Sequence, residues 1–348
     1  MTDRANIDAP IDALLVLPHL RIQNANAISS PLTWGFPSIT AFVGLMHALE
    51  RCLNDTLPIA LQGVGVVCHH HQALTDSAGF TTSFNLTRNP VDKTGATAAI
   101  VEEGRIHLDI SLVFGVQRLQ GFAVHDEAAQ TAMAAAVGEA LAGLRVAGGS
   151  VIPAPAGRSA RRGSARLVSL GDPGDDRDKV FRRERRRWLP GFALVSRDDL
   201  LQARLAELRV LRPQASALDA WLDLSSLTHH ARRNPVADPN GGGAGETVEW
   251  VTRRPAGWTV PIPVGYAALS ELHPPGAVSH ARDASTPFRF VESVYSIGQW
   301  ISPHRLRDAS ELLWVPRHDP ASGLYRCHNR FRPPPSAPQA LATPAPHH

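Results

Sequence analysis

The sequence predicts an α+β protein with a compact N-terminal core, a long insertion within that core, and an additional C-terminal α/β region. Three observations support this fold class. Strand-like and helix-like apolar patterns alternate through the first 153 residues. The 348 residues are 43% hydrophobic and 19% charged, which suffices for a sizeable core and excludes a disordered chain. No apolar run reaches the roughly 18 residues of a membrane span.

The first four elements follow from their own patterns. The apolar run 13–22 predicts a buried strand, in which Pro18 indicates an edge or a bulge. Ser38 is a typical cap for a helix with apolar residues at helical spacing. Its stripe consists of Phe42, Leu45, Met46, Leu49 and Leu53. Residues 59–71 are a Val-rich strand with interspersed glycines, and residues 105–116 alternate as a strand does.

Two further elements complete the N-terminal core. Asp126 opens an Ala-rich helix, and residues 146–153 predict a last strand. The order strand, helix, strand, strand, helix, strand is the ferredoxin-like plan of many RNA-binding modules, including the RRM. Residues 73–104 form an insertion that is too long for an ordinary connection, and we expect it to be functional or disordered.

The remaining chain predicts a second region and a tail. Residues 1–153 are the expected core, residues 154–331 a helical and mixed region that packs on it, and residues 332–348 a disordered Pro-rich tail. The second region contains a helix at 198–212 and a Gly-rich loop at 240–245. Further apolar segments return to the core at 258–269, 288–301 and 312–315.

The positive charge comes almost wholly from arginine. Of 35 Lys and Arg residues only Lys93 and Lys179 are lysine, which leaves 33 arginines. Planar guanidinium groups suit phosphates and base edges, although the codon bias of a GC-rich genome produces the same composition. A basic ridge is expected on one helix, where it would neutralise phosphates, remain solvated or contact an acidic partner. Its members are Lys179, Arg182, Arg183, Arg186 and Arg187.

Three short segments concentrate groups that bind nucleic acid. The loop 23–37 offers amides, hydroxyls and an aromatic face at Asn24, Asn26, Ser29, Ser30 and Trp34. The string at 84–90 places Arg88 between Asn85 and Asn89. Gly148 and Gly149 with Ser150 leave backbone N–H groups open to a phosphate. Each segment has a plainer interpretation as an ordinary turn or solvated hairpin.

The sequence shows no recognisable catalytic or metal-binding pattern. Cys52, Cys68 and Cys327 lack the pairing of a zinc site or a disulfide framework, which favours a reducing, cytoplasmic setting. His69, His70 and His71 alternate between strand faces, so that at most two could share a metal. We expect neither cofactor nor metal, and no enzymatic activity.

Several long strings resemble one family. They are LRIQNANAISSPLTWGFPS at 20–38, FNLTRNP at 84–90, TAAIVEEGR at 97–105, LPGFALVSR at 189–197, GWTVPIPVGYAALS at 257–270, ARDASTPFRFVE at 281–292 and WISPHRL at 300–306. Together they resemble the second-subunit family of the Csy complex, Cas-five-like RAMP proteins of type I-F CRISPR surveillance complexes. The likeness extends to about Phe331.

The resemblance implies a fold, partners and site residues. It implies a RAMP-type RRM-like core with a thumb-like insertion, and a heterodimer with the large Csy subunit that holds the 5′ handle of the CRISPR RNA. The first repeated backbone subunit would adjoin it, and target DNA would be reached through the complex, with no membrane involved. The three segments above match the family strings or the usual glycine-rich position, and Arg282 and Arg289 fall in another matching string, where they bind phosphate or brace the core.

Two other functions remain open from the residues alone. One is a RAMP-family endonuclease that processes CRISPR RNA, which needs a histidine such as His19 or His304 beside the bound phosphate. The other is an architectural subunit that docks through its arginine ridge and scarcely touches RNA.

Replacement of Arg88 by alanine tests the thumb-like insertion. We expect Arg88→Ala to weaken binding of handle RNA by the large and second subunits together, because a guanidinium contact to a phosphate is lost. Filter binding over a salt series measures the effect. Unchanged affinity together with an unchanged salt slope would reject this role for Arg88.

Overall fold

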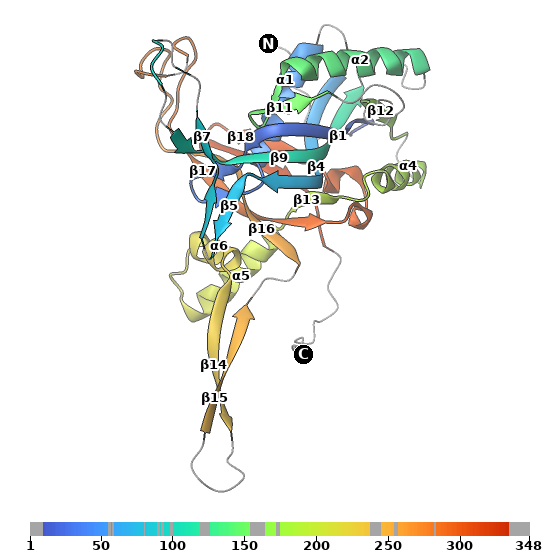
Figure 1. The fold of residues 1–348 in the computed structure, drawn as a ribbon. Coiled ribbons are helices and arrows are strands. Elements are labelled where there is room, and N and C mark those ends of the chain that lie inside the picture. Colours follow the sequence, from blue (N-terminus) through green and yellow to red (C-terminus); the bar gives the residue numbers. More distant parts are fainter. Residues whose placement is uncertain are drawn as a thin grey trace.

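The protein has a mixed α/β fold built on one large antiparallel sheet (Figure 1). The computed structural model describes residues 10–54, 57, 59–79, 81–88, 91, 94–97, 100–118, 126–153, 164–171, 175–236, 245–253, 257–281 and 283–333. Within those ranges no helix has the length and apolar character needed to cross a membrane. The Gly-rich segment 240–244 and most of the Pro-rich tail lie outside the described residues.

The helices and strands alternate along the chain. The described α-helices are α1 (Ile39–Leu53), α2 (Glu127–Gly143), α4 (Asp175–Arg186), α5 (Asp198–Leu211) and α6 (Ala217–Ser225), and the short 3-10 helices are η1 (Pro303–Arg305) and η2 (Ala309–Glu311). The large sheet contains, in spatial order, β10 (Arg145–Val146), β11 (Gly149–Ile152), β1 (Ala13–Asn26), β9 (Arg105–Arg118), β4 (Ile59–Ala73), β13 (Phe192–Ser196), β17 (Val291–Ile301), β16 (Trp258–Ala268), β19 (Leu324–Asn329) and β18 (Trp314–Asp319), with β12 (Arg166–Ser169) paired to β1.

Four small two-stranded sheets project from this body. They are β2 (Ile28–Ser30) with β3 (Thr33–Trp34), β5 (Thr75–Ala78) with β6 (Thr81–Phe84), β7 (Leu86–Arg88) with β8 (Ile100–Glu102), and β14 (Thr228–Val236) with β15 (Gly245–Arg253). The insertion expected at 73–104 contains two of them. Figure 1 shows β14 and β15 as an arm that extends away from the sheet.

The N-terminal strands agree with the sequence pattern except at their ends. The bulge expected at Pro18 is confirmed, because the register of β1 against β9 shifts between Leu17 and Leu20 and His19 has a positive φ of 48°. Two details were wrong. The polar segment after Ile22 continues β1 to Asn26, and residues 146–153 are the end of β10, a turn and β11 rather than one strand.

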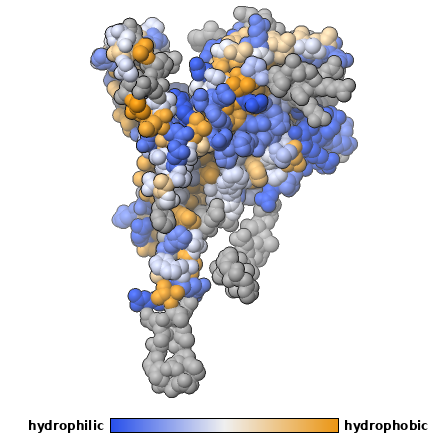
Figure 2. Space-filling view, in the orientation of Figure 1, coloured by the Kyte–Doolittle hydropathy of each residue, from blue (hydrophilic) through white to orange (hydrophobic). Residues whose placement is uncertain are grey.

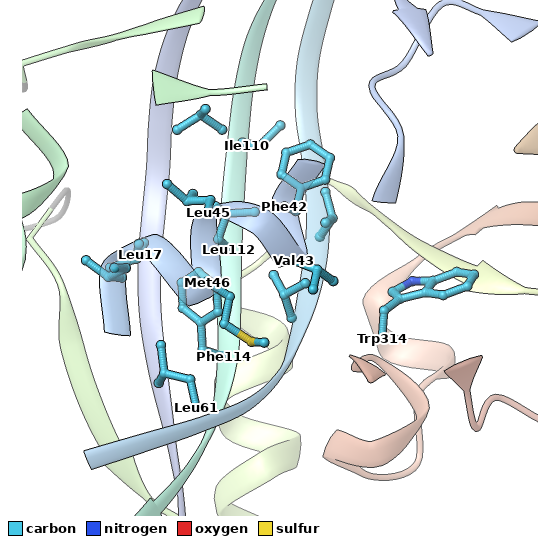
Figure 3. Close-up of a cluster of buried hydrophobic side chains, with 14 of the residues drawn as sticks. Leu17, Phe42, Val43, Leu45, Met46, Leu61, Ile110, Leu112, Phe114 and Trp314 are labelled. Carbon is cyan, nitrogen blue, oxygen red and sulfur yellow. The ribbon is translucent and has the colours of Figure 1, made fainter. Parts of the chain in front are cut away.

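Helices α1 and α2 cover one face of the sheet. Ser38 caps α1 and Asp126 caps α2, as expected, each by accepting a hydrogen bond from a backbone N–H. Figure 3 shows Phe42 and Met46 of α1 close to Leu112 of β9 in a buried cluster. The stripe of α2 contributes Met133, Val137 and Leu141 to the same core.

The opposite face of the sheet is covered by the second half of the chain. Leu14 and Val16 of β1 point to this face, where they share a buried cluster with Phe181 and Trp188 at α4. Alternation along β1 therefore buries both of its faces, which explains why its sequence is a continuous apolar run rather than an alternating one.

Strands from the second half also close the edge of β4. β13 pairs with β4 at Val67 and Cys68, and β18 pairs with it at Val64. β13 pairs with β17, β17 with β16, β16 with β19, and β19 with β18. Since β13 and β18 both pair with β4, the six strands form a closed ring. Two glycines of β4 allow the close approach: a Cβ at Gly63 would lie 2.9 Å from the carbonyl oxygen of Trp314, and one at Gly65 would lie 2.3 Å from Cγ of Leu312.

A pair of glycine-to-alanine substitutions tests this seam. We expect Gly65→Ala to destabilise the protein by about 1–3 kcal/mol, because the buried Leu312 side chain must shift. Gly138→Ala, on the exposed side of α2 with open space around it, should stabilise the protein by up to about 1 kcal/mol. Urea unfolding measures both. Equal effects of the two substitutions would contradict the tight seam.

Candidate nucleic-acid interface

A groove of about 570 Å³ lies where α1 begins. Three segments that are distant in the sequence line it: the end of β1 with the β2–β3 hairpin, the β10–β11 hairpin, and the paired strands β16 and β19. Of the residues predicted to bind nucleic acid, the groove brings together Asn26, Ser29 and Gly148.

The β2–β3 hairpin is held by its own polar side chains. The amide of Asn26 donates to the carbonyl oxygen of Ile28 at 2.8 Å and accepts from its N–H at 3.0 Å, which fixes the entry to the hairpin. The hydroxyls of Ser29 and Ser30 both contact Oγ1 of Thr33, at 2.8 and 2.6 Å. Ser30 is buried, so its role is to build the hairpin, and Asn26 and Ser29 are presented at the groove wall.

The β10–β11 hairpin packs directly on β1. A Cβ at position 149 would lie 2.7 Å from the backbone N of Ala25, so only glycine permits this contact. The N–H of Asn26 donates to the carbonyl oxygen of Ala147 at 2.8 Å. Ala147 and Gly148 both have positive φ, and the space above Gly148 is open. The two predicted glycines therefore differ: Gly149 serves packing, and Gly148 lines the groove.

Arg145 supplies the positive charge of the groove. Its Nη1 lies 3.3 Å from the carbonyl oxygen of Gly148 and 3.4 Å from the hydroxyl of Ser150. These contacts hold an exposed guanidinium at the groove wall, and Ser150 acts through Arg145 rather than as part of the lining. No Asp or Glu is among the described lining residues.

The floor of the groove is the first half of α1. The N-terminal end of a helix carries a partial positive charge that favours anions. Gly44 has no side chain that would protrude from this floor. A Cβ at this position would meet nothing within 4 Å, so the space above it is open. The hydroxyl of Tyr266 on β16 lies 3.3 Å from that of Thr40, and Tyr325 of β19 is beside it in the groove. Burial raises the pKa of the Tyr325 hydroxyl, which keeps it a neutral hydrogen-bond donor.

This arrangement suits a phosphodiester strand with exposed bases. A guanidinium and a helix N-terminus attract phosphate, and amide and hydroxyl groups position it. The two tyrosine rings offer surfaces on which bases stack.

Other predicted residues lie near the groove but do not line it. Trp34 is 59% exposed and makes an edge-to-face contact with Phe84 at 5.5 Å, so the β2–β3 hairpin and the insertion touch. Asn24 has a positive φ, and its N–H donates to Nδ1 of His107 at 3.2 Å. The side-chain oxygen of Asn85 is buried without a hydrogen-bond partner among the described residues.

The remaining predicted residues are not brought into the groove. Arg289 lies beside Gly323 in the β18–β19 turn, where a Cβ would be 3.0 Å from Nη1 of Arg289. Asn89, Arg282 and the side chain of Arg88 lie outside what the structure describes.

Comparison with known proteins places the chain in a family. The family model described as CRISPR-associated protein (Cas_Csy2) matches residues 15–327. The chain is also 49% identical over 317 residues to CRISPR-associated protein Csy2 of Pseudomonas aeruginosa (strain UCBPP-PA14), which covers 90% of this chain and 94% of that protein. The chain belongs to the Csy2 family of CRISPR-associated proteins. It is therefore a component of the type I-F Csy system, as its sequence strings indicated.

Sequence reasoning missed several groove residues of this Csy2-family chain. Arg145 lies three residues before the predicted glycine pair, and its charge next to a tight hairpin was a usable signal. Thr40 and Gly44 were assigned only to a helix, because a solvent-facing helix position carries no signal for a groove. Tyr266 lies in a family string, but its position over α1 depends on strands far along the chain.

Two of the histidines considered for metal or catalysis, His19 and His69, stack on each other at the β1 bulge and hydrogen-bond to neighbouring residues. His19 stacks on His69 with 4.0 Å between ring centroids, and Nδ1 of His19 lies 3.0 Å from Oδ1 of Asp109. Nε2 of His69 lies 2.7 Å from the hydroxyl of Ser111, and Nδ1 lies 2.7 Å from the carbonyl oxygen of Pro190. His304 is elsewhere, with Nδ1 beside the hydroxyl of Ser302 at 2.7 Å. Both ring nitrogens of His69 are thus occupied within the protein.

The protein should lose stability as the pH falls through the titration of His69. Burial lowers the pKa of His69 below 6.5, and the nearby His19 adds to this effect. The folded state then binds fewer protons than the unfolded state, so the free energy of unfolding decreases as the pH falls below about 6.5.

Urea unfolding between pH 7.5 and 5.5 measures this loss against the variant His69→Gln. Glutamine does not titrate, so the variant should lose less stability over the same interval. An identical pH dependence of the two proteins would show that His69 contributes nothing to it.

Proposed function

We propose that this chain is a non-catalytic subunit that holds the 5′ handle of the CRISPR RNA in the groove at the start of α1. The observation that carries the proposal is the convergence of Arg145, Asn26, Ser29 and Tyr266 from three separate segments on one groove whose described lining residues include no carboxylate. Phosphates of the handle bind at Arg145 and the helix N-terminus, and Asn26 and Ser29 position the strand.

The bases of the handle stack on aromatic rings in the groove and beside it. Tyr266 is 40% exposed and Trp34 59% exposed, so both rings have a face available. The contact of Trp34 with Phe84 supports a path from the groove to the insertion that carries Arg88. The insertion then acts as the thumb that holds the bent strand.

The core is of the RAMP type in this proposal. The strand order β11-β1-β9-β4, antiparallel throughout, with α1 and α2 on one face, is the order of a ferredoxin-like core. That order supports the assignment of an RRM-like core with an RNA-binding role.

The large Csy subunit is the protein partner in the proposal, with the first repeated backbone subunit beside it. Exposed apolar side chains support such docking, because they gather on α5, α6 and the β14–β15 arm. They include Val210, Leu211, Leu222 and Trp250, the last of which is 70% exposed. Target DNA is then engaged through the assembled complex.

RNA cleavage is assigned to other proteins in this proposal. The two ring nitrogens of His69 are held by Ser111 and Pro190, and His19 is oriented by Asp109, which fits a structural cluster. Incubation of the purified chain with repeat RNA in EDTA discriminates the endonuclease alternative. The proposal expects intact RNA, and cleavage that is abolished by His19→Ala would overturn it.

Filling the groove floor tests handle binding directly. We expect Gly44→Gln to weaken binding of a synthetic handle RNA by this chain with the large subunit at least tenfold, because the side chain occupies the groove. Gly138→Gln is the matched control, since it makes the same change at an exposed position of α2 with open space. Filter binding and thermal unfolding are measured for both variants.

Both substitutions should raise or preserve the melting temperature, because glutamine favours helix more than glycine. Loss of RNA binding by Gly44→Gln alone supports the groove. Equal affinity of both variants and the unsubstituted chain would contradict it.

A further inference from the structure

A second hollow, of about 520 Å³, has four arginines among the apolar and polar residues that line it. It lies where α4, η2, β18 and the residues after β19 meet. Asp308 is the one carboxylate among its described lining residues. Its cationic residues are Arg177, Arg317, Arg330 and Arg332, with His328 beside them. We call this hollow the arginine pocket.

The arginine pocket and the handle groove lie on opposite sides of the large sheet and share no lining residue. The groove is floored by α1, which packs on the sheet face that carries Leu15 and Leu17. The pocket contains Ala309 and Ile11, which belong with Leu14 and Val16 of the other face. One short strand held in the groove therefore does not account for the pocket.

The helix that supplies Arg177 to the pocket carries further positive charge on its opposite, exposed face. On α4, Lys179 pairs with Asp176, and Glu184 pairs with Arg166 and Arg187. Arg182, Arg183 and Arg186 are exposed and form no ion pair with any residue that the structure describes. Burial, with the charges of Arg182 and Arg186, lowers the pKa of Arg185. Like charges are thus crowded on this helix, a state that anions relieve.

The surroundings of the pocket favour phosphate over a protein partner. Protein interfaces depend on apolar and aromatic anchors at their centres. Among the described residues, Leu189 is the one exposed large hydrophobic side chain in 175–191 or 302–333. Figure 2 shows hydrophilic residues over the side of the molecule where α4 lies. Exposed cations with so few exposed apolar side chains beside them are typical of surfaces that contact a nucleic-acid backbone.

We infer that α4 and the arginine pocket form a second nucleic-acid site, which binds the phosphodiester backbone of a double-stranded segment without reading its sequence. The ridge of Arg182 and Arg186, one helical turn apart, lies along the backbone, and the pocket holds a phosphate with Arg332 and its neighbours. This site goes beyond handle binding, because it takes a different strand on the other side of the sheet.

The test is binding of a 20-bp DNA duplex of unrelated sequence to the full chain over a series of NaCl concentrations. Arg182→Gln with Arg186→Gln removes two charges from the ridge, and Arg332→Gln removes one from the pocket. Arg212→Gln with Arg232→Gln is the matched control for duplex binding by the chain alone, since these exposed arginines lie directly after α5 and on the arm. Binding of handle RNA in complex with the large subunit is measured for the ridge and pocket variants.

We expect the ridge variant to bind the duplex at least tenfold more weakly and to reduce the slope of log K against log salt by about 1.8, or about 0.9 per lost contact. The pocket variant should reduce the slope by about 0.9. The control should leave the slope unchanged, and handle RNA should bind the ridge and pocket variants as tightly as it binds the unsubstituted chain.

Three results would overturn the inference: no binding of duplex by the unsubstituted chain, an equal loss in the control, or an unchanged slope in the ridge and pocket variants. If the variants lost assembly with the large subunit but kept duplex binding, this surface would be assigned to a protein partner. That result would also overturn the inference. If every variant failed to bind handle RNA while duplex binding stayed intact, the result would count against the handle groove alone.

Discussion

The rest of the structure depends on how the second edge of β4 is paired. A long, apolar strand edge exposes backbone N–H and C=O groups that must be paired. The second half of the chain pairs them with β13 and β18, and Gly63 and Gly65 provide the space for the chain to approach. The two halves are therefore joined through one sheet, and the buried Trp314 donates from Nε1 to the carbonyl oxygen of Leu194 across the ring at 2.9 Å.

This closure creates the candidate site as well as the core. The ring carries β16 across the start of α1, where the hydroxyl of Ser38 contacts the carbonyl oxygen of Pro263 at 3.3 Å. Tyr266 and Tyr325 thereby become one wall of a groove whose other walls come from the first 150 residues. The same closure leaves α4 and the arginine pocket on the opposite side of the sheet. One chain thus presents two separate cationic surfaces, each on its own side of a rigid sheet.

Much of the N-terminal core could be predicted from the sequence, because its signals are local. The caps Ser38 and Asp126, the bulge at Pro18 and the stripe of α1 each depend on neighbours in the chain. The closed ring, the hairpin at Gly148 and the partnership of Tyr266 with Thr40 depend on contacts between distant residues, which periodicity does not encode. For the same reason, the sequence does not reveal that Ser30 is bonded to Thr33 within its hairpin or that Gly149 packs against β1.

The central claim is that the groove at the start of α1 holds guide RNA. The most direct test is photocrosslinking of the assembled complex with 4-thiouridine placed in the RNA handle. Mass spectrometry then locates the crosslinks on this chain. The account predicts adducts in the peptides that contain Tyr266 and residues 145–148, and loss of those adducts in Gly44→Gln. Adducts confined to other surfaces, or none on this chain, would contradict it.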